Sequence, residues 1–213
     1  MIITISRQFG AGGALVARML ADRLGWSLVD NELIDEVATR AGIAPEEVAE
    51  HDERAPGFIE RLTRALASSM PEFVAPESGT LPDLAEERLV KITERVVSEA
   101  AEQGKVVLVG RAAPAVLASH PRTLHLKIVA PLADRIARVV ERQGIDLKQA
   151  EKLIHDADSN RARYHKQYYQ RDWADPTNYG LVINTARLGI EGAVEVILVT
   201  LNRIQRSGDR VIG

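Results

Sequence analysis

The sequence predicts an α/β protein in which helices cover both faces of a parallel sheet. Three observations support this fold class. Five short, continuous apolar runs recur along the 213 residues, as expected of strands that are buried on both faces. Patterns with helical periodicity separate these runs, and a glycine-rich segment directly follows the first of them. This alternation is typical of a parallel sheet that is covered on both sides.

The apolar runs give the positions of the expected strands. They are Ile2–Ser6, Ser27–Val29, Val106–Val109, Leu124–Val129 and Leu181–Ile183. In open parallel sheets, ligands bind beyond the carboxyl ends of the strands. We therefore expect one functional edge, formed by residues that end or follow the runs: Ser6, Asp30, Arg111 and Asn184.

The expected helices follow from apolar stripes at helical spacing, each closed by a glycine. The stripes run from Leu15 to Leu24, from Ile92 to Ala101 and from Leu132 to Val140. A last helix is expected from about Ile190 to Ile204. The polar segment Leu147–Arg171 is interpreted as one long helix or a pair of helices.

The composition of the chain excludes several kinds of site and gives no indication of several kinds of partner. The chain has a net charge of −3 and no cysteine, and its five histidines show no spacing typical of a metal site. The charge gives no indication of a nucleic-acid partner, and the lack of cysteine excludes disulfides and thiolate metal sites. No apolar run is long enough to cross a membrane, and the chain starts with a strand rather than a signal core. We expect a cytoplasmic protein with no nucleic-acid or membrane partner.

The glycine-rich segment predicts a phosphate-binding loop. Gly10, Gly12 and Gly13 let backbone N–H groups approach an anion, and the helix that follows adds a partial positive charge. The alternative is a tight strand-to-helix turn without a ligand. The segment lacks the lysine and the hydroxyl of a standard Walker A loop, because Gly13 occupies the lysine position and Arg7 that of the first glycine.

Motifs along nearly the whole chain resemble one family. They are Ile3–Gly13, Asp30–Ile34, Gly110–Arg111, Ala130–Ile136, Asp158–Tyr164, Asp172–Tyr179 and Asn184–Thr185. In this order they are similar to the cytidylate kinase-like family of P-loop nucleoside monophosphate kinases. The resemblance implies a three-layer P-loop NTPase fold, with a five-stranded parallel sheet flanked by helices, an acceptor-binding insertion and an arginine-bearing lid. It also implies ATP as the donor, Mg²⁺ as a cofactor and a nucleoside monophosphate, CMP or dCMP first, as the acceptor.

We expect residues 1–213 to form a single domain of this kind. Its core is assigned to about 1–43 and 82–213, and its lid to about 147–171. The insertion is assigned to about 44–81, where prolines interrupt helical pieces. A homodimer is a further expectation.

The resemblance assigns donor binding to the first loop. The residues are Ser6, Gly10, Ala11, Gly12, Gly13 and Ala14. Ala14 stands where relatives often carry an arginine. Losing the lysine without a replacement would cost orders of magnitude in rate, because charge-stabilising groups of this kind are each worth ~10³ or more.

On the acceptor side, the resemblance implies that Arg111 of the Gly110–Arg111 pair holds the acceptor phosphate, and we expect this residue to begin a helix. A planar guanidinium suits bidentate phosphate binding. The helix dipole disfavours an arginine at a helix start, which favours a ligand there. The alternative is an ordinary surface arginine. Asp30 is expected to orient hydrated Mg²⁺ or to assist the acceptor, with a helix N-cap as an equal alternative.

Two insertion residues complete the expected acceptor site. Asp52 and Arg54 could contact the base or ribose, or form a charge network within a helix. Glu36 stands where cytidylate kinases carry an arginine for the acceptor phosphate. The absence of this arginine weakens the sequence-based case for CMP as the acceptor.

Five arginines are expected to supply positive charge during transfer: Arg7, Arg135, Arg138, Arg161 and Arg163. Arg135 and Arg138 are three residues apart, so they can converge on one ligand from one helix face. Arg161 and Arg163 belong to the lid, whose closure would exclude water. Their spacing of two splays them on a regular helix, although at a helix end they could straddle phosphates. The alternative is a solvated basic face paired with Asp156 and Asp158.

Two functions from different classes remain open. One is direct in-line phosphoryl transfer. The other is a nucleotide-binding sensor or pseudokinase without transfer, which Gly13, Ala14, Leu15 and Glu36 favour. A kinase for another small metabolite is a third option. The position of Arg7 discriminates between them. A guanidinium over the glycine loop favours catalysis, whereas one directed into solvent favours a binding protein.

Overall fold

A computed structural model describes residues 1–30 and 82–208. Its five strands form one parallel sheet in the order β2-β3-β1-β4-β5. The strands are β1 (Ile2–Arg7), β2 (Ser27–Val29), β3 (Val106–Val109), β4 (Thr123–Val129) and β5 (Leu181–Asn184). All five predicted runs are therefore strands, and their boundaries differ from the prediction by one residue at most.

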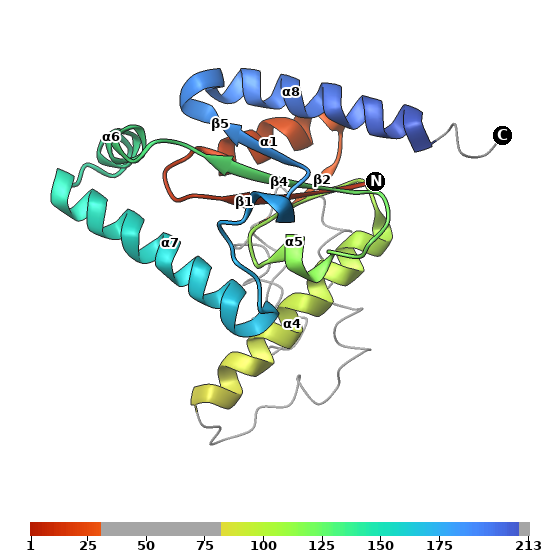
Figure 1. Ribbon diagram of the computed structural model, residues 1–213, viewed down its shortest axis with the longest axis horizontal. Coiled ribbons are helices and arrows are strands. Elements are labelled where there is room, and N and C mark those ends of the chain that lie inside the picture. The colour runs from red at the N-terminus through yellow and green to blue at the C-terminus, as the bar shows by residue number, and fades with distance from the viewer. Residues whose placement is uncertain (31–81, 209–213) are drawn as a thin grey trace, which may run out of the picture.

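Helices cover the sheet on both faces (Figure 1). Helices α1 (Gly13–Leu24) and α8 (Thr185–Gly208) pack on one face, and α4 (Pro82–Gln103) and the short α5 (Ala113–Val116) pack on the other. Each face has its own apolar core, with Ile3 and Ile5 facing α1 and α8, and Ile2 facing α4 and α5. The predicted three-layer arrangement is confirmed.

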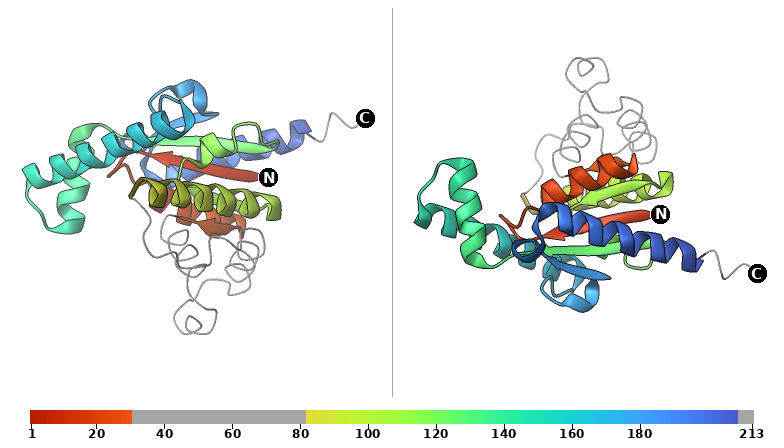
Figure 2. Two further views of the ribbon diagram at one scale, coloured as in Figure 1. Left: turned by 90° about the horizontal axis from the view of Figure 1, so that it is seen from below. Right: turned by 90° about the horizontal axis from the view of Figure 1, so that it is seen from above.

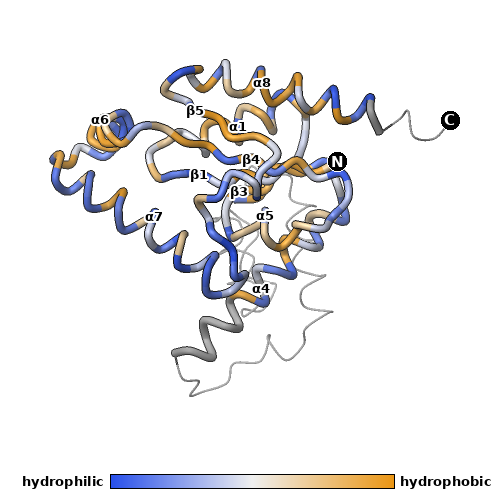
Figure 3. Tube along the Cα trace, viewed as in Figure 1, coloured by the Kyte–Doolittle hydropathy of each residue, from blue (hydrophilic) through white to orange (hydrophobic). Residues whose placement is uncertain are grey.

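Helices α6 (Leu132–Gln143) and α7 (Leu147–Tyr169) pack against each other beyond the carboxyl ends of the strands. They project from that end of the sheet in the views of Figure 2. Helix α7 is hydrophilic over most of its length (Figure 3), as the sequence predicted. It is one continuous helix and not a pair, and Asp146 and Gln149 start it with a reciprocal capping box.

Three details of the predicted helices need correction. Arg111 does not begin a helix: it has a left-handed backbone (φ 47°) and precedes α5, which starts at Ala113. The helix dipole therefore gives no indication of a ligand at Arg111. Leu15 and Leu132 belong to the predicted apolar stripes but are 58% and 44% exposed. The last helix starts earlier than expected, at Thr185, with a non-helical Gly189 before its regular part.

Candidate functional site

The loop between β1 and α1 requires its glycines for both conformation and space. Gly10 and Gly12 have φ of 77° and 80°, which residues with a side chain rarely adopt. A Cβ on Gly12 would lie 2.6 Å from Ile190 Cδ1, and one on Gly10 would lie 3.0 Å from the Arg135 carbonyl oxygen. Helix α1 then starts with no side-chain cap and no acidic residue in its first turn. Its first N–H groups are thus suited to an anion.

Residues of α6 and α8 support this loop from outside. The Thr185 hydroxyl donates to the Ala11 carbonyl oxygen at 2.7 Å, and Arg138 Nη1 donates to Thr185 Oγ1 at 3.0 Å. Arg135 Nη1 donates to the Phe9 carbonyl oxygen at 3.2 Å. Arg135 and Arg138 therefore contact different parts of the loop and its supports. Each guanidinium has its own protein partners here, and the expectation that the two arginines converge on one ligand stays a prediction.

Asp158 ties α7 to the loop. Its Oδ1 accepts from the Phe9 backbone N–H at 2.8 Å and from Arg161 Nη1 at 2.9 Å, while its Oδ2 accepts from Arg135 Nη1 at 2.6 Å. Side-chain exposure is 17% for Asp158 and 9% for Arg135. This cluster, which we call the Asp158 clamp, fixes the predicted lid helix against the phosphate loop.

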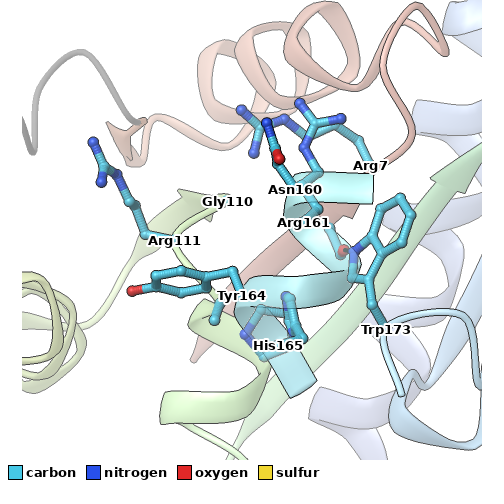
Figure 4. Close-up of a pocket in the computed structure, with 11 residues that line it drawn as sticks. Arg7, Gly110, Arg111, Asn160, Arg161, Tyr164, His165 and Trp173 are labelled. Atoms are coloured by element: carbon cyan, nitrogen blue, oxygen red, sulfur yellow. Dashed lines mark hydrogen bonds between the residues drawn. The ribbon is translucent and has the colours of Figure 1, made fainter. Parts of the chain in front are cut away.

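A cavity of about 210 Å³ opens beside the loop. Figure 4 shows Arg111 on one side of it, with Arg7 and Arg161 across from it and Tyr164, His165 and Trp173 below. The other lining residues are Ser6, Gly110, Ala112, Pro114 and Asn160. Three guanidinium groups thus surround a cavity with a largely aromatic floor.

Arg7 occupies the boundary between the loop and this cavity. Because side chains alternate along a strand, Arg7 lies on the same face of the sheet as Ile3 and Ile5, toward α1. It is partly buried, and it lines both the main cavity and a second hollow of about 90 Å³. Burial, together with the positive charges of Arg161 and Arg111, lowers the pKa of Arg7 to about 10, against the opposing effect of Asp30. Arg7 therefore turns toward the loop and the cavity rather than into solvent.

A buried polar network holds the floor of the cavity from the other face of the sheet. Trp173 Nε1 donates to Ser6 Oγ at 2.7 Å, and the Tyr179 hydroxyl donates to the Trp173 carbonyl oxygen at 3.0 Å. Lys127 pairs with Ser6 in the sheet register, donates to the Trp173 carbonyl oxygen and lies 4.1 Å from the Trp173 ring centroid. Burial lowers the pKa of Lys127 to about 8. Ser6, which was predicted to bind the donor, holds Trp173 at the cavity floor through this hydrogen bond.

Lys127 and Trp173 were not among the site residues that the sequence predicted. One signal was available for Lys127, a lone lysine between Leu126 and Ile128 in an apolar strand. The signal for Asp158 was weaker, because the sequence indicated it only as a partner for arginines of a solvated basic face.

The remaining predicted residues divide into three groups. Ala14 and Asp30 line the smaller hollow together with Arg7. Arg163 lies within α7 rather than at a helix end, and its exposed guanidinium donates to Asn160 Oδ1 at 2.8 Å, away from the main cavity. Asp52 and Arg54, like the whole predicted insertion, lie outside the described residues.

Comparison with known proteins matches residues 2–187 to the cytidylate kinase-like family. The chain belongs to this family. The cytidylate kinase of Methanopyrus kandleri is 27% identical over 218 residues, which cover 98% of this chain and 97% of that protein. The resemblance inferred from the sequence motifs is confirmed.

Solved structures agree with the fold of this cytidylate kinase-like chain. An uncharacterized protein from Eubacterium ventriosum is 25% identical, with a TM-score of 0.66, over 95% of this chain and 98% of that one. Shikimate kinase from Bacteroides thetaiotaomicron is 16% identical, with a TM-score of 0.53, over 95% of this chain and 98% of that one. This second likeness concerns the fold alone, and it agrees with the predicted three-layer arrangement around a five-stranded parallel sheet.

Two further findings concern metals and membranes. In residues 1–30 and 82–208, no group of three or more histidine, aspartate or glutamate side chains is placed to hold a metal ion. None of the helices in this part of the chain has both the length and the apolar character needed to cross a membrane.

Proposed function

We propose that this cytidylate kinase-like protein transfers a phosphoryl group from ATP to a nucleoside monophosphate, with CMP or dCMP as the first candidates. The observation that carries this proposal is the convergence of Arg7, Arg111 and Arg161 on one cavity beside an uncapped, glycine-rich helix start. Charged groups that surround a cavity in this way suit a ligand with several phosphate charges. The family and the name of the Methanopyrus kandleri relative support the same reaction class.

The geometry suggests a role for each group. The N–H groups at the start of α1 bind the donor phosphates, and Arg111 holds the acceptor phosphate across the cavity. An oxygen of the acceptor phosphate attacks the terminal phosphorus of ATP, and the bond from that phosphorus to the ADP oxygen breaks. Arg7 and Arg161 stabilise the charge on the transferring group. The acceptor phosphate is already ionised near neutral pH, so the reaction needs no general base.

Asp30 is the carboxylate that we assign to Mg²⁺. It follows β2 and lines the small hollow beside Ala14 and Arg7. Mg²⁺ in kinase sites is held by one or two carboxylates together with substrate phosphates and water, so a single aspartate fits such a set. When bound, the ion would neutralise phosphate charge during transfer.

We also propose that the chain has the domain organisation predicted from its sequence. Residues 1–213 form one domain, in which α7 belongs to a lid at about 147–171 and the acceptor insertion occupies about 44–81. In this proposal, Asp52 and Arg54 of that insertion, which lie outside the described residues, would contact the base or ribose. A homodimer in the cytoplasm, acting on nucleotides and not on nucleic acids, completes the proposed setting.

The test is ATP-dependent transfer across CMP, dCMP, UMP, AMP and GMP in the presence of Mg²⁺. We expect one of these nucleotides to be converted to its diphosphate, and Arg111→Ala to raise the KM for that acceptor by at least tenfold. ATP binding without conversion of any of the five would refute transfer to nucleoside monophosphates.

The alternative function is a nucleotide-binding sensor. Gly13 and Ala14, in place of the usual lysine and hydroxyl, favour it. So does the Asp158 clamp, whose carboxylate already accepts one loop N–H. Binding of ATP without any acceptor turnover is the result that would establish this alternative.

A further inference from the structure

Among the glycines of the phosphate loop, Gly13 is the one at which an added Cβ would come closest to a charged side chain, that of Arg7. A Cβ on Gly13 would lie 2.6 Å from Arg7 Cβ, 2.9 Å from Arg7 Cγ and 3.6 Å from Arg7 Cδ. These are its three nearest neighbours, and all belong to the aliphatic stem of Arg7. Unlike Gly10 and Gly12, Gly13 does not have a positive φ. Gly13 is therefore required because a side chain at this position would collide with Arg7, and not because of its backbone conformation.

The two residues hold related positions in the loop pattern. A Walker A loop has glycines at its first and sixth positions and lysine at its seventh, where the lysine reaches the β- and γ-phosphates. Gly12 matches the sixth position, so Arg7 stands at the first and Gly13 at the seventh. Relative to that pattern, the small residue and the cation have exchanged places, and the stem of Arg7 crosses the point where a lysine side chain would begin.

The surroundings of Arg7 favour an anionic ligand. It is partly buried, and within residues 1–30 and 82–208 its guanidinium makes no hydrogen bond or ion pair. Arg161 and Arg111 add positive charge around it, and Asp30 offsets only part of this. A partly buried cation beside like charges is unfavourable unless an anion completes the site.

Arg161 is a weaker candidate for the lysine role. The Asp158 carboxylate accepts a hydrogen bond from its Nη1 at 2.9 Å, so part of its charge is already balanced. Arg161 also comes from α7 and not from the loop.

We infer that Arg7 replaces the missing lysine as the loop's own phosphate-binding cation, and that Gly13 stays without a side chain so that the Arg7 stem can cross the start of α1. This inference rests on the proposed function for its role in transfer. Its two physical parts, the steric coupling and the binding of a polyphosphate, can be measured without turnover.

The first experiment measures polyphosphate binding by calorimetry, with inorganic tripolyphosphate as the probe. We expect Arg7→Gly to weaken binding at least tenfold, and the exposed Arg23→Gln on α1, which removes the same charge, to change it less than twofold. The double variant Arg7→Gly/Gly13→Lys restores a lysine at the seventh position and should recover at least half of the lost binding free energy. Unchanged binding in Arg7→Gly, or no recovery in the double variant, would overturn the inference.

The second experiment tests the steric coupling through thermal unfolding. Gly13→Ala should lower the Tm by about 3–8 °C while Arg7 is present, because overpacking destabilises, and by less than about 2 °C in the Arg7→Gly background. Gly192→Ala in α8 is the matched control, since its Cβ would come only within 3.4 Å of Leu188 Cβ. An equal loss of Tm in both backgrounds would show that Arg7 is not what excludes a side chain at residue 13.

A turnover assay distinguishes failure of this inference from failure of the proposed function. If the wild type transfers phosphate, Arg7→Gly should lower kcat by ~10²–10³ and the double variant should exceed either single variant by at least tenfold. If the wild type transfers to no acceptor, the proposed function fails, while the two experiments above still decide the role of Arg7. Transfer that is unaffected by Arg7→Gly would refute the inference and leave the proposed function standing.

Discussion

Replacing Asp158 by asparagine should loosen the lid helix from the phosphate loop. The side chain is nearly isosteric, so the change removes charge and one acceptor oxygen without creating a cavity. Asp158 accepts hydrogen bonds from the Phe9 N–H, Arg135 and Arg161. An asparagine can keep only part of this set, and its amide group would direct a donor toward a guanidinium.

The expected cost follows from these contacts. A hydrogen bond to a charged group contributes about 1.5–3 kcal/mol, and breaking a buried ion pair costs about 3–5 kcal/mol. Asp158 retains 17% side-chain exposure, and Arg135 retains 9%, so solvent offsets part of the loss. We expect the free energy of unfolding to fall by about 2–4 kcal/mol, which for a chain of this size lowers the Tm by about 5–15 °C.

Urea unfolding followed by circular dichroism measures this loss. Asp156→Asn is the matched control, because Asp156 is exposed on the same helix and a surface change of this kind costs about 0.5 kcal/mol or less. In a double-mutant cycle, Arg161→Gln should cost less in the Asp158→Asn background than in the wild type. If Asp158→Asn and Asp156→Asn unfold alike, the clamp does not stabilise the fold and the reasoning fails.

Three further predictions concern the cavity and the core. Arg161→Gln should lower kcat by ~10²–10³ while the exposed Arg163→Gln stays within about twofold of wild type; equal kcat values for the two variants would contradict the assigned positions. In a Trp26→Phe variant, saturating acceptor nucleotide should change the fluorescence of Trp173 at the cavity floor; no change at full occupancy would place the acceptor elsewhere. Burial lowers the pKa of His165 to about 4, so between pH 4 and 6.5 the unfolded chain binds more protons and stability rises with pH, by up to about 1.4 kcal/mol per pH unit from this group. His165→Gln should flatten that part of a stability–pH profile, and an unchanged slope would contradict a buried neutral histidine.

Local patterns were sufficient to predict the five strands and the long helices in the described part of this fold. The apolar run Val106–Val109, for example, indicated a doubly covered strand, and glycines such as Gly25 and Gly144 end their helices in left-handed conformations. Both signals act over a few residues, so a single sequence displays them. The carboxyl-edge rule then brought Ser6, Asp30 and Arg111 toward one end of the sheet.

The contacts that define the site act over much longer separations. Phe9 and Asp158 are 149 residues apart in sequence, and Ser6 and Trp173 are 167 apart. The periodicity of apolar residues along the chain does not indicate contacts between residues so far apart in sequence. Spacing placed Arg135 and Arg138 on one side of α6, but it could not show that each has its own partner in the loop or its supports. The left-handed backbone of Arg111 likewise depends on how β3 leads into α5, and no composition signal marks it.

The most direct test of the central claim is a crystal structure with Mg²⁺, a non-hydrolysable ATP analogue and the acceptor that the transfer assay selects. The account predicts the donor phosphates on the N–H groups at the start of α1, and the acceptor phosphate between Arg111 and the pair Arg7 and Arg161. It also predicts the Arg7 guanidinium within hydrogen-bond distance of a phosphate oxygen. Nucleotides bound outside the cavity, or an Arg7 without phosphate contact, would contradict it.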